Sequence, residues 1–208
     1  MADNRRNQAR KLLRVLRNLV ITVVGIAALF AYSVLEIRIA VVHNILVIGP
    51  NTFITQTQKA FWYLERCSPK AVGTIDESIS VIVVSGNAYG IYANWRVFLA
   101  TMDSAFGPTY SESEQLLWYM GALAHEGYHG WQYRNGYYTT WDELNLSERE
   151  ALEKGPLGFQ IETIRQCYDD VPGSTYLEAQ GLTKPLEDIR NGVVPCGYCM
   201  EGLKEQSK

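Results

Sequence analysis

The sequence predicts a small α+β domain behind a single membrane-spanning helix. Three observations support this fold class: an uncharged apolar run at residues 19–35, two stretches rich in β-branched and aromatic residues at 78–86 and 90–102, and a long helical segment at 111–135. The chain has 208 residues, of which 47% are apolar and 20% charged. Such a chain is long enough to bury one core and is not disordered.

The apolar run at residues 19–35 is long enough to cross a bilayer. Its residues carry no charge, and at a rise of 1.5 Å per residue they span about 26 Å. Six of the 19 basic residues precede residue 18, and lysine and arginine resist translocation. We therefore expect a single-pass membrane protein, with a basic cytoplasmic segment (1–18), a transmembrane signal-anchor (19–36) and an extracytoplasmic domain (37–208).

Two other interpretations of this run stay open. A cleaved signal peptide would use Ala31-Tyr32-Ser33 as its small-x-small site and would export the same domain. A buried core helix fits less well beside the positive cluster. All but one of the 22 acidic residues follow the run, so the domain is acidic. We therefore expect no nucleic-acid partner.

Local patterns predict the elements before the long helix. Residues 37–48 are rich in isoleucine and valine, and form either an extension of the anchor helix or a first strand. Residues 59–67 suit a helix that ends before Ser68-Pro69. Residues 78–86 are typical of a buried strand and turn, and residues 90–102 are expected to be the hairpin partner of that strand.

A capping box predicts the start of the long helix. Ser111 and Glu114 have the serine-x-x-glutamate spacing, and the helix is expected to end near Asn135-Gly136. A second helix is expected to begin around Leu146-Ser147 and to be interrupted by Gly155-Pro156. A further helical segment follows, and the tail beyond residue 172 is rich in turn-forming residues.

The long helix carries His125-Glu126-Gly127-Tyr128-His129, an HExxH pattern. Histidines four residues apart lie on one helix face, so both imidazoles can reach one metal ion, and neutral imidazole is a preferred zinc ligand. Glu126 lies at the edge of this face, where it can hydrogen-bond a water on the metal without binding the metal itself. The pattern predicts His125 and His129 as zinc ligands and Glu126 as the general base.

These residues resemble the zincin metallopeptidases, and within them the branch whose third zinc ligand is a glutamate on a later helix. The resemblance covers about residues 78–168, and HExxH is its sharp motif. It implies a short mixed sheet, an active-site helix and a glutamate-bearing helix. It also implies peptide hydrolysis by a zinc-activated water, with the substrate paired along a strand near residues 90–100.

The resemblance implies a third ligand roughly twenty or more residues after His129, often a glutamate three places before an alanine. Glu148 stands in this relation to Ala151, and we predict it as the third ligand of Zn²⁺. Glu150 and Glu153 are the alternatives.

Other residues are candidates for the surroundings of the metal. Leu152 stands where the resemblance often has an acid that supports a ligand histidine. Gln132 also occurs in related motifs, and it either hydrogen-bonds near the site or is simply exposed. Tyr137, Tyr138 or Arg134 would stabilise an oxyanion, with ordinary packing as the favoured alternative for the tyrosines.

The four cysteines, Cys67, Cys167, Cys196 and Cys199, all follow the predicted anchor and would meet an oxidising compartment. Two disulfides are the simplest interpretation, with three pairings open. A redox pair formed by Cys196 and Cys199, or a structural zinc site of all four thiolates, is the alternative. The third histidine, His43, is expected to be a satisfied or interfacial side chain rather than a ligand.

The sequence therefore predicts a membrane-anchored zinc metallopeptidase that acts on a peptide or protein substrate. A catalytically inactive zincin-like binding module stabilised by zinc is the main alternative, and an oxidoreductase that uses Cys196 and Cys199 is another. Glu126 favours the enzyme, because a purely structural zinc site needs no base and usually fills its fourth position with protein.

Overall fold

The computed structural model describes residues 37–86, 89–102, 105 and 110–193. The predicted cytoplasmic segment and anchor, like Cys196 and Cys199, lie outside the described residues. None of the helices in the described part of the chain is long and apolar enough to cross a membrane.

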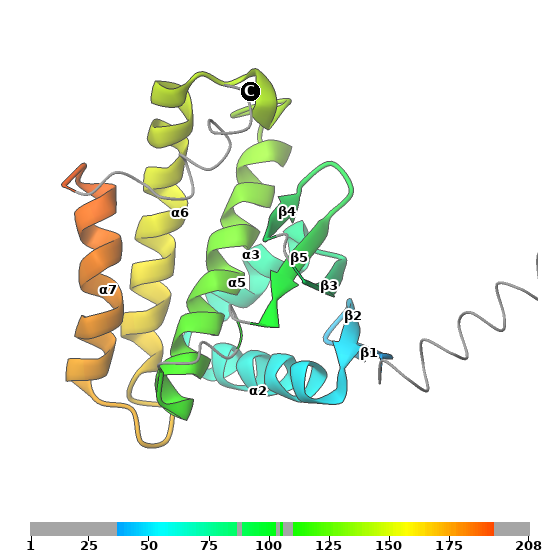
Figure 1. Ribbon diagram of the computed structural model, residues 1–208, viewed down its shortest axis with the longest axis vertical. Helices are drawn as coiled ribbons and strands as arrows, with labels where there is room; N and C mark the ends of the chain where they lie inside the picture. Colours follow the sequence, from blue (N-terminus) through cyan, green and yellow to red (C-terminus); the bar gives the residue numbers. More distant parts are fainter. Residues whose placement is uncertain (1–36, 87–88, 103–104, 106–109, 194–208) are drawn as a thin grey trace, which may run out of the picture. The chain divides into compact units, whose positions relative to one another are not determined.

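A five-stranded mixed sheet forms one part of the domain (Figure 1), with the strand order β1-β2-β3-β5-β4. The strands are β1 (Ile37–Val42), β2 (Ile45–Pro50), β3 (Val81–Ser85), β4 (Gly90–Tyr92) and β5 (Val97–Thr101). β3 pairs in parallel with both β2 and β5, whereas β4 runs antiparallel to β5 at the edge of the sheet. The mixed sheet implied by the resemblance is therefore confirmed.

Two strand predictions are refined by this topology. Residues 37–48 form strands β1 and β2, with His43 in the turn at a left-handed φ of 55°. The predicted hairpin between 78–86 and 90–102 is wrong in its pairing. The hairpin joins β4 to β5, while β3 pairs with β5 in parallel, Val81 opposite Val97. Such register depends on contacts between distant segments, which local patterns do not encode.

Five α-helices of the described residues complete the domain. They are α2 (Asn51–Cys67), α3 (Pro69–Ser78), α5 (Glu112–Arg134), α6 (Leu146–Cys167) and α7 (Tyr176–Arg190), and a short 3₁₀ helix η1 (Trp141–Glu143) precedes α6. α5 packs against α3 on one side and α6 on the other, and α7 covers the far side of α6 (Figure 1). The α+β class is confirmed, while α3 and α7 lie where no helix was expected.

α5 begins as the sequence predicts. The Ser111 hydroxyl accepts a hydrogen bond from the backbone N–H of Glu114, and the Glu114 carboxylate accepts one from the N–H of Ser111 at 2.8 Å. At its other end the helix stops at Arg134, and the N–H of the capping residue Asn135 donates to the carbonyl of Trp131. The reciprocal cap formed by Ser111 and Glu114 satisfies two of the N–H groups that a helix start leaves unpaired.

Glycines let α5 approach its neighbours closely. A Cβ at Gly130 would lie 2.7 Å from Ser78 Cβ at the end of α3, and one at Gly121 would lie 2.9 Å from the Ile164 side chain of α6. Real side-chain atoms do not approach this closely, so α5 would have to move from α3 at Gly130, and the Ile164 side chain would have to shift at Gly121. α5 is therefore held between α3 and α6.

α6 is one continuous helix, which corrects the predicted interruption at Gly155-Pro156. Proline removes one backbone hydrogen bond and is costly within a helix. Here Pro156 and Leu157 are buried, and a Cβ at Gly155 would meet Tyr128 of α5 at 2.8 Å. Tight packing on α5 therefore offsets the lost backbone bond.

A disulfide joins Cys67 at the end of α2 to Cys167 at the end of α6, across 100 residues of sequence. One of the two expected disulfides is thus present among the described residues. It ties the carboxyl end of α6 to the helix that leads out of the sheet.

Candidate metal centre

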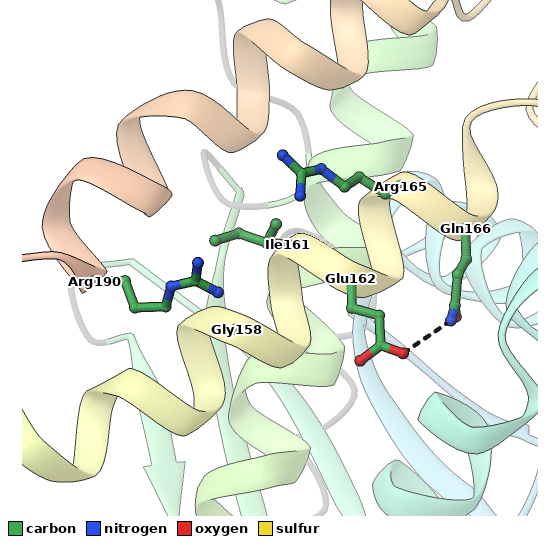
Figure 2. Close-up of a pocket in the computed structure, with 6 residues that line it drawn as sticks. All are labelled: Gly158, Ile161, Glu162, Arg165, Gln166 and Arg190. Carbon is green, nitrogen blue, oxygen red and sulfur yellow. Dashed lines mark hydrogen bonds between the residues drawn. The ribbon is translucent and has the colours of Figure 1, made fainter.

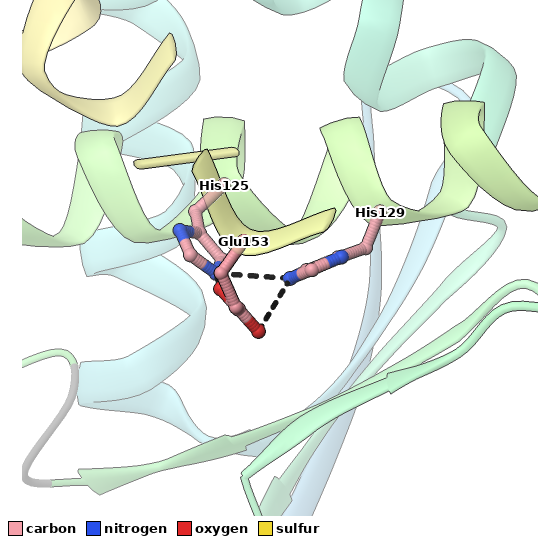
Figure 3. Close-up of side chains that lie close together, drawn as sticks. All are labelled: His125, His129 and Glu153. Carbon is pink, nitrogen blue, oxygen red and sulfur yellow. Dashed lines mark hydrogen bonds and ion pairs between the residues drawn. The ribbon is translucent and has the colours of Figure 1, made fainter. Parts of the chain in front are cut away.

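Three side chains from α5 and α6 converge on one point. His125 Nε2 and His129 Nε2 lie 3.1 Å apart. A Glu153 carboxylate oxygen lies 3.4 Å from the His125 Nε2 and the other oxygen lies 3.3 Å from the His129 Nε2. Figure 3 shows the two rings on α5 and the carboxylate on α6 pointing toward one another. The three side chains are largely buried, each at most 13% exposed.

The size of this triangle fits a small divalent cation. Ligand atoms bound about 2.0–2.1 Å from a tetrahedral zinc ion lie about 3.3–3.4 Å from one another. The two imidazole nitrogens are 3.1 Å apart, and each lies 3.3 to 3.4 Å from one of the two oxygens of the Glu153 carboxylate. Two histidines and one glutamate are also a donor set that zinc uses in catalytic sites. The described part of the chain therefore contains a candidate metal site at His125, His129 and Glu153.

Glu148, the predicted third ligand, lies outside this triangle, and the alternative Glu153 lies within it. The Glu148 carboxylate accepts a hydrogen bond of 2.9 Å from the backbone N–H of Asn145, and so caps its own helix. Glu153 follows Glu148 by five positions, which places the two about 140° apart around α6. Glu150 is exposed. Among the three alternatives, the packing of α6 on α5 brings Glu153 to the histidines.

The carboxylate and the imidazoles of the triangle stabilise each other's charged forms. Burial alone would raise the pKa of Glu153, but hydrogen bonds and charges from His125 and His129 outweigh burial and hold this pKa well below its usual range. Burial alone would lower the pKa of His129, but Glu153, together with Glu126 and Gln132, outweighs burial and raises that pKa. Glu153 is therefore an ionised carboxylate at neutral pH, which is the form that binds a cation.

Glu126 lies beside the triangle and outside the ligand set. It is 4% exposed, and burial raises the pKa of its carboxyl, although the charges of His125 and His129 oppose the shift. The backbone of Ile91 in the edge strand β4 also hydrogen-bonds this carboxylate. A buried carboxylate with a raised pKa, next to metal ligands, has the properties of a general base.

Aromatic and amide groups enclose the His129 side chain. The Trp141 ring of η1 meets the imidazole edge-on at 5.4 Å between centroids. The Gln132 amide oxygen lies 3.1 Å from His129 Nδ1. His125 differs, because its Nδ1 is buried and has no hydrogen-bond partner among the described residues. Sequence patterns do not identify Trp141, since nothing local links η1 to α5.

The structure separates the three oxyanion candidates. Tyr137 is 59% exposed, and Arg134 donates to Glu77 at 3.0 Å. The Tyr138 hydroxyl donates to the backbone carbonyl of His129 at 3.2 Å. Burial is the largest cause that raises the pKa of this hydroxyl, and the nearby carboxylates raise it further. Tyr138 therefore lies next to the ligand helix, where it supports the backbone of His129.

An open pocket of the domain lies away from the ligand triangle. Figure 2 shows this open pocket of about 380 Å³ between α6 and α7, lined by Gly158, Ile161, Glu162, Arg165, Gln166 and Arg190. Arg165 is already paired with Glu187 at 2.6 Å. No residue of the candidate metal site contributes to this pocket.

Comparison with models of protein families, with curated proteins and with solved structures gives no match to this chain. The candidate site therefore stands on the geometry of its own residues.

Proposed function

We propose that the protein is a zinc-dependent metallopeptidase that hydrolyses peptide bonds. The observation that carries this proposal is the triangle of His125, His129 and Glu153, with Glu126 buried beside it. Three protein ligands are typical of catalytic zinc sites, where the fourth position is left for water. A structural site would instead be closed by a fourth side chain.

Each residue has a definite task in this proposal. His125, His129 and Glu153 hold the ion, and bound zinc would supply a water of lowered pKa and polarise the scissile carbonyl. Glu126 accepts the proton of the attacking water and delivers it to the leaving nitrogen. Burial suits Glu126 to this task, because a raised pKa makes the carboxylate a stronger base.

The edge strand β4 supports a peptide as the substrate. It is the last strand of the sheet, and Ile91 within it lies against Glu126. An extended peptide can add to such an edge by main-chain hydrogen bonds. A substrate bound there would pass beside the general base.

We also propose that the domain is held outside the cytoplasm by residues 19–36. The basic cluster before the apolar run supports this orientation. The Cys67–Cys167 disulfide adds independent support, since disulfides persist mainly in oxidising compartments.

The proposal is tested by comparing the full-length protein with its Glu126→Gln variant. We expect both to retain one zinc ion by metal analysis, and the variant to cleave a peptide library at least about 100-fold more slowly. Equal turnover by both proteins would remove Glu126 from the mechanism. Zinc binding without turnover by the wild type would favour the alternative, an inactive zinc-stabilised binding module.

A further inference from the structure

Pro156 leaves one carbonyl of α6 without its usual partner. In a continuous α-helix the N–H of residue 156 would bond the carbonyl of residue 152, but proline has no N–H. The Gln132 side chain of α5 takes this place, because its Nε2 donates to the Leu152 carbonyl at 2.9 Å. A side chain from one helix thus completes the backbone hydrogen bonding of the other.

The other end of the Gln132 amide faces a ligand histidine. Its Oε1 lies 3.1 Å from His129 Nδ1, and an amide oxygen can only accept a hydrogen bond. The proton of the neutral imidazole is therefore favoured on Nδ1, which leaves a lone pair on Nε2. That nitrogen is the one that faces His125 and Glu153.

Burial makes this bridge costly to break. Gln132 is 4% exposed, so both the carbonyl of Leu152 and the Nδ1 of His129 would lose a partner in a largely dry environment. Leu152 is also the residue directly before Glu153. The bridge thus links one ligand on α5 to the turn of α6 that carries another ligand.

We propose that Gln132 is the positioning residue of the metal site, and that Pro156 makes this role possible by freeing the Leu152 carbonyl. This inference rests on the proposed zinc function. Gln132 holds His129 in the tautomer that binds a metal, and it fixes α6 at the height where Glu153 completes the triangle. In metal sites the second ring nitrogen of a ligand histidine usually has such a partner.

Two variants separate the halves of the bridge. Gln132→Met removes both hydrogen bonds, and we expect zinc affinity, measured by chelator competition, to fall about 10–100-fold. Gln132→Glu keeps an acceptor for His129 Nδ1–H but loses the donor to Leu152. We expect its zinc affinity to fall less than that of Gln132→Met, because His129 is still oriented while α6 is no longer held, and we expect its unfolding midpoint to fall as well. Gln166→Met is the matched control, because Gln166 also bridges two groups but lies away from the ligands.

The tautomer is read directly by ¹⁵N NMR of the imidazoles in metal-free protein at alkaline pH. In the wild type we expect the proton of His129 on Nδ1, and in Gln132→Met on Nε2, where it donates to Glu153. A loss of packing alone would not move this signal. The same tautomer in both proteins, together with equal zinc affinity, would overturn the proposal.

The role of Pro156 is tested in a double-mutant cycle. Pro156→Ala restores a backbone N–H to the Leu152 carbonyl, so Gln132→Met should shift the urea midpoint less in that background than in the wild type. Equal shifts would show that the carbonyl does not depend on Gln132. If the wild type binds no zinc, the proposed function fails. The NMR measurement of the His129 tautomer and the double-mutant cycle still test whether Gln132 bridges His129 and Leu152.

Discussion

Two clusters in this domain combine histidine with carboxylates, and they differ in where the nitrogens point. In the first, His43 Nε2 lies 2.8 Å from Glu65 and its Nδ1 lies 3.5 Å from Asp76. In the second, the Nε2 atoms of His125 and His129 both face Glu153. The first arrangement gives one imidazole an acceptor on each side, whereas the second brings two imidazoles to one carboxylate.

This difference separates an ion pair from a chelating site. In the His43 cluster each ring nitrogen faces a carboxylate of its own, on opposite sides of the ring, so the three groups do not converge on one cation. The second cluster presents three electron-pair donors to a single point, and a cation bound there satisfies all of them. Exposure follows the same division, since the Glu65 side chain is 51% exposed and the Glu153 side chain 13%. The direction of lone pairs, rather than residue composition, therefore identifies the metal site.

The largest expected effect comes from removing the carboxylate of the second cluster. Loss of a residue that supports a ligand can weaken metal binding by about 100-fold. Glu153→Gln should weaken zinc binding by more than this, because the charged ligand itself is lost. Isothermal titration with zinc measures this change. Glu148→Gln is the matched control on the same helix, since glutamine also serves in a capping box. Weaker binding in Glu148→Gln than in Glu153→Gln would restore the original choice of ligand.

A smaller effect is expected from the spacing between the two ligand helices. A Cβ at Gly155 would lie 2.8 Å from Tyr128 Cε1, so Gly155→Ala should push α6 from α5 and cost about 1–3 kcal/mol of unfolding free energy. Zinc affinity should fall with it, because Glu153 moves. Gly181→Ala in α7, where nothing lies within 4 Å, should instead stabilise the protein by up to about 1 kcal/mol. Urea unfolding measures the stability of both variants. Equal changes in unfolding free energy for Gly155→Ala and Gly181→Ala would contradict the idea that close contact between α5 and α6 sets the cost.

The local parts of this fold and site were predictable from sequence. The Ser111 capping box and the spacing of His125 and His129 depend on residues three or four apart, and the structure has both arrangements. Glu126 is equally local, since it follows the first histidine directly. Helical periodicity and cap chemistry act over such distances without help from the rest of the chain.

The missed parts depend on packing between distant segments. Glu148 and Glu153 both belong to α6, and only the rotation of that helix on α5 decides which one reaches the histidines. Pro156 suggested a break in α6. The donor that replaces its missing N–H comes from Gln132, 24 positions earlier, so no local pattern could show it.

The smallest expected effect lies in the first cluster, and it tests the other side of the comparison. Glu65→Gln removes the negative charge from the 2.8 Å contact with His43, and the exposed position of Glu65 limits the loss of unfolding free energy to about 0–1 kcal/mol. Because solvent ions screen such a pair, the loss should shrink further in 1 M salt, where the screening length falls to about 3 Å. Urea unfolding at low and high salt measures both values. A salt-independent loss above about 2 kcal/mol would contradict a surface ion pair, and zinc affinity should stay at the wild-type value in this variant because Glu65 contributes nothing to the ligand triangle.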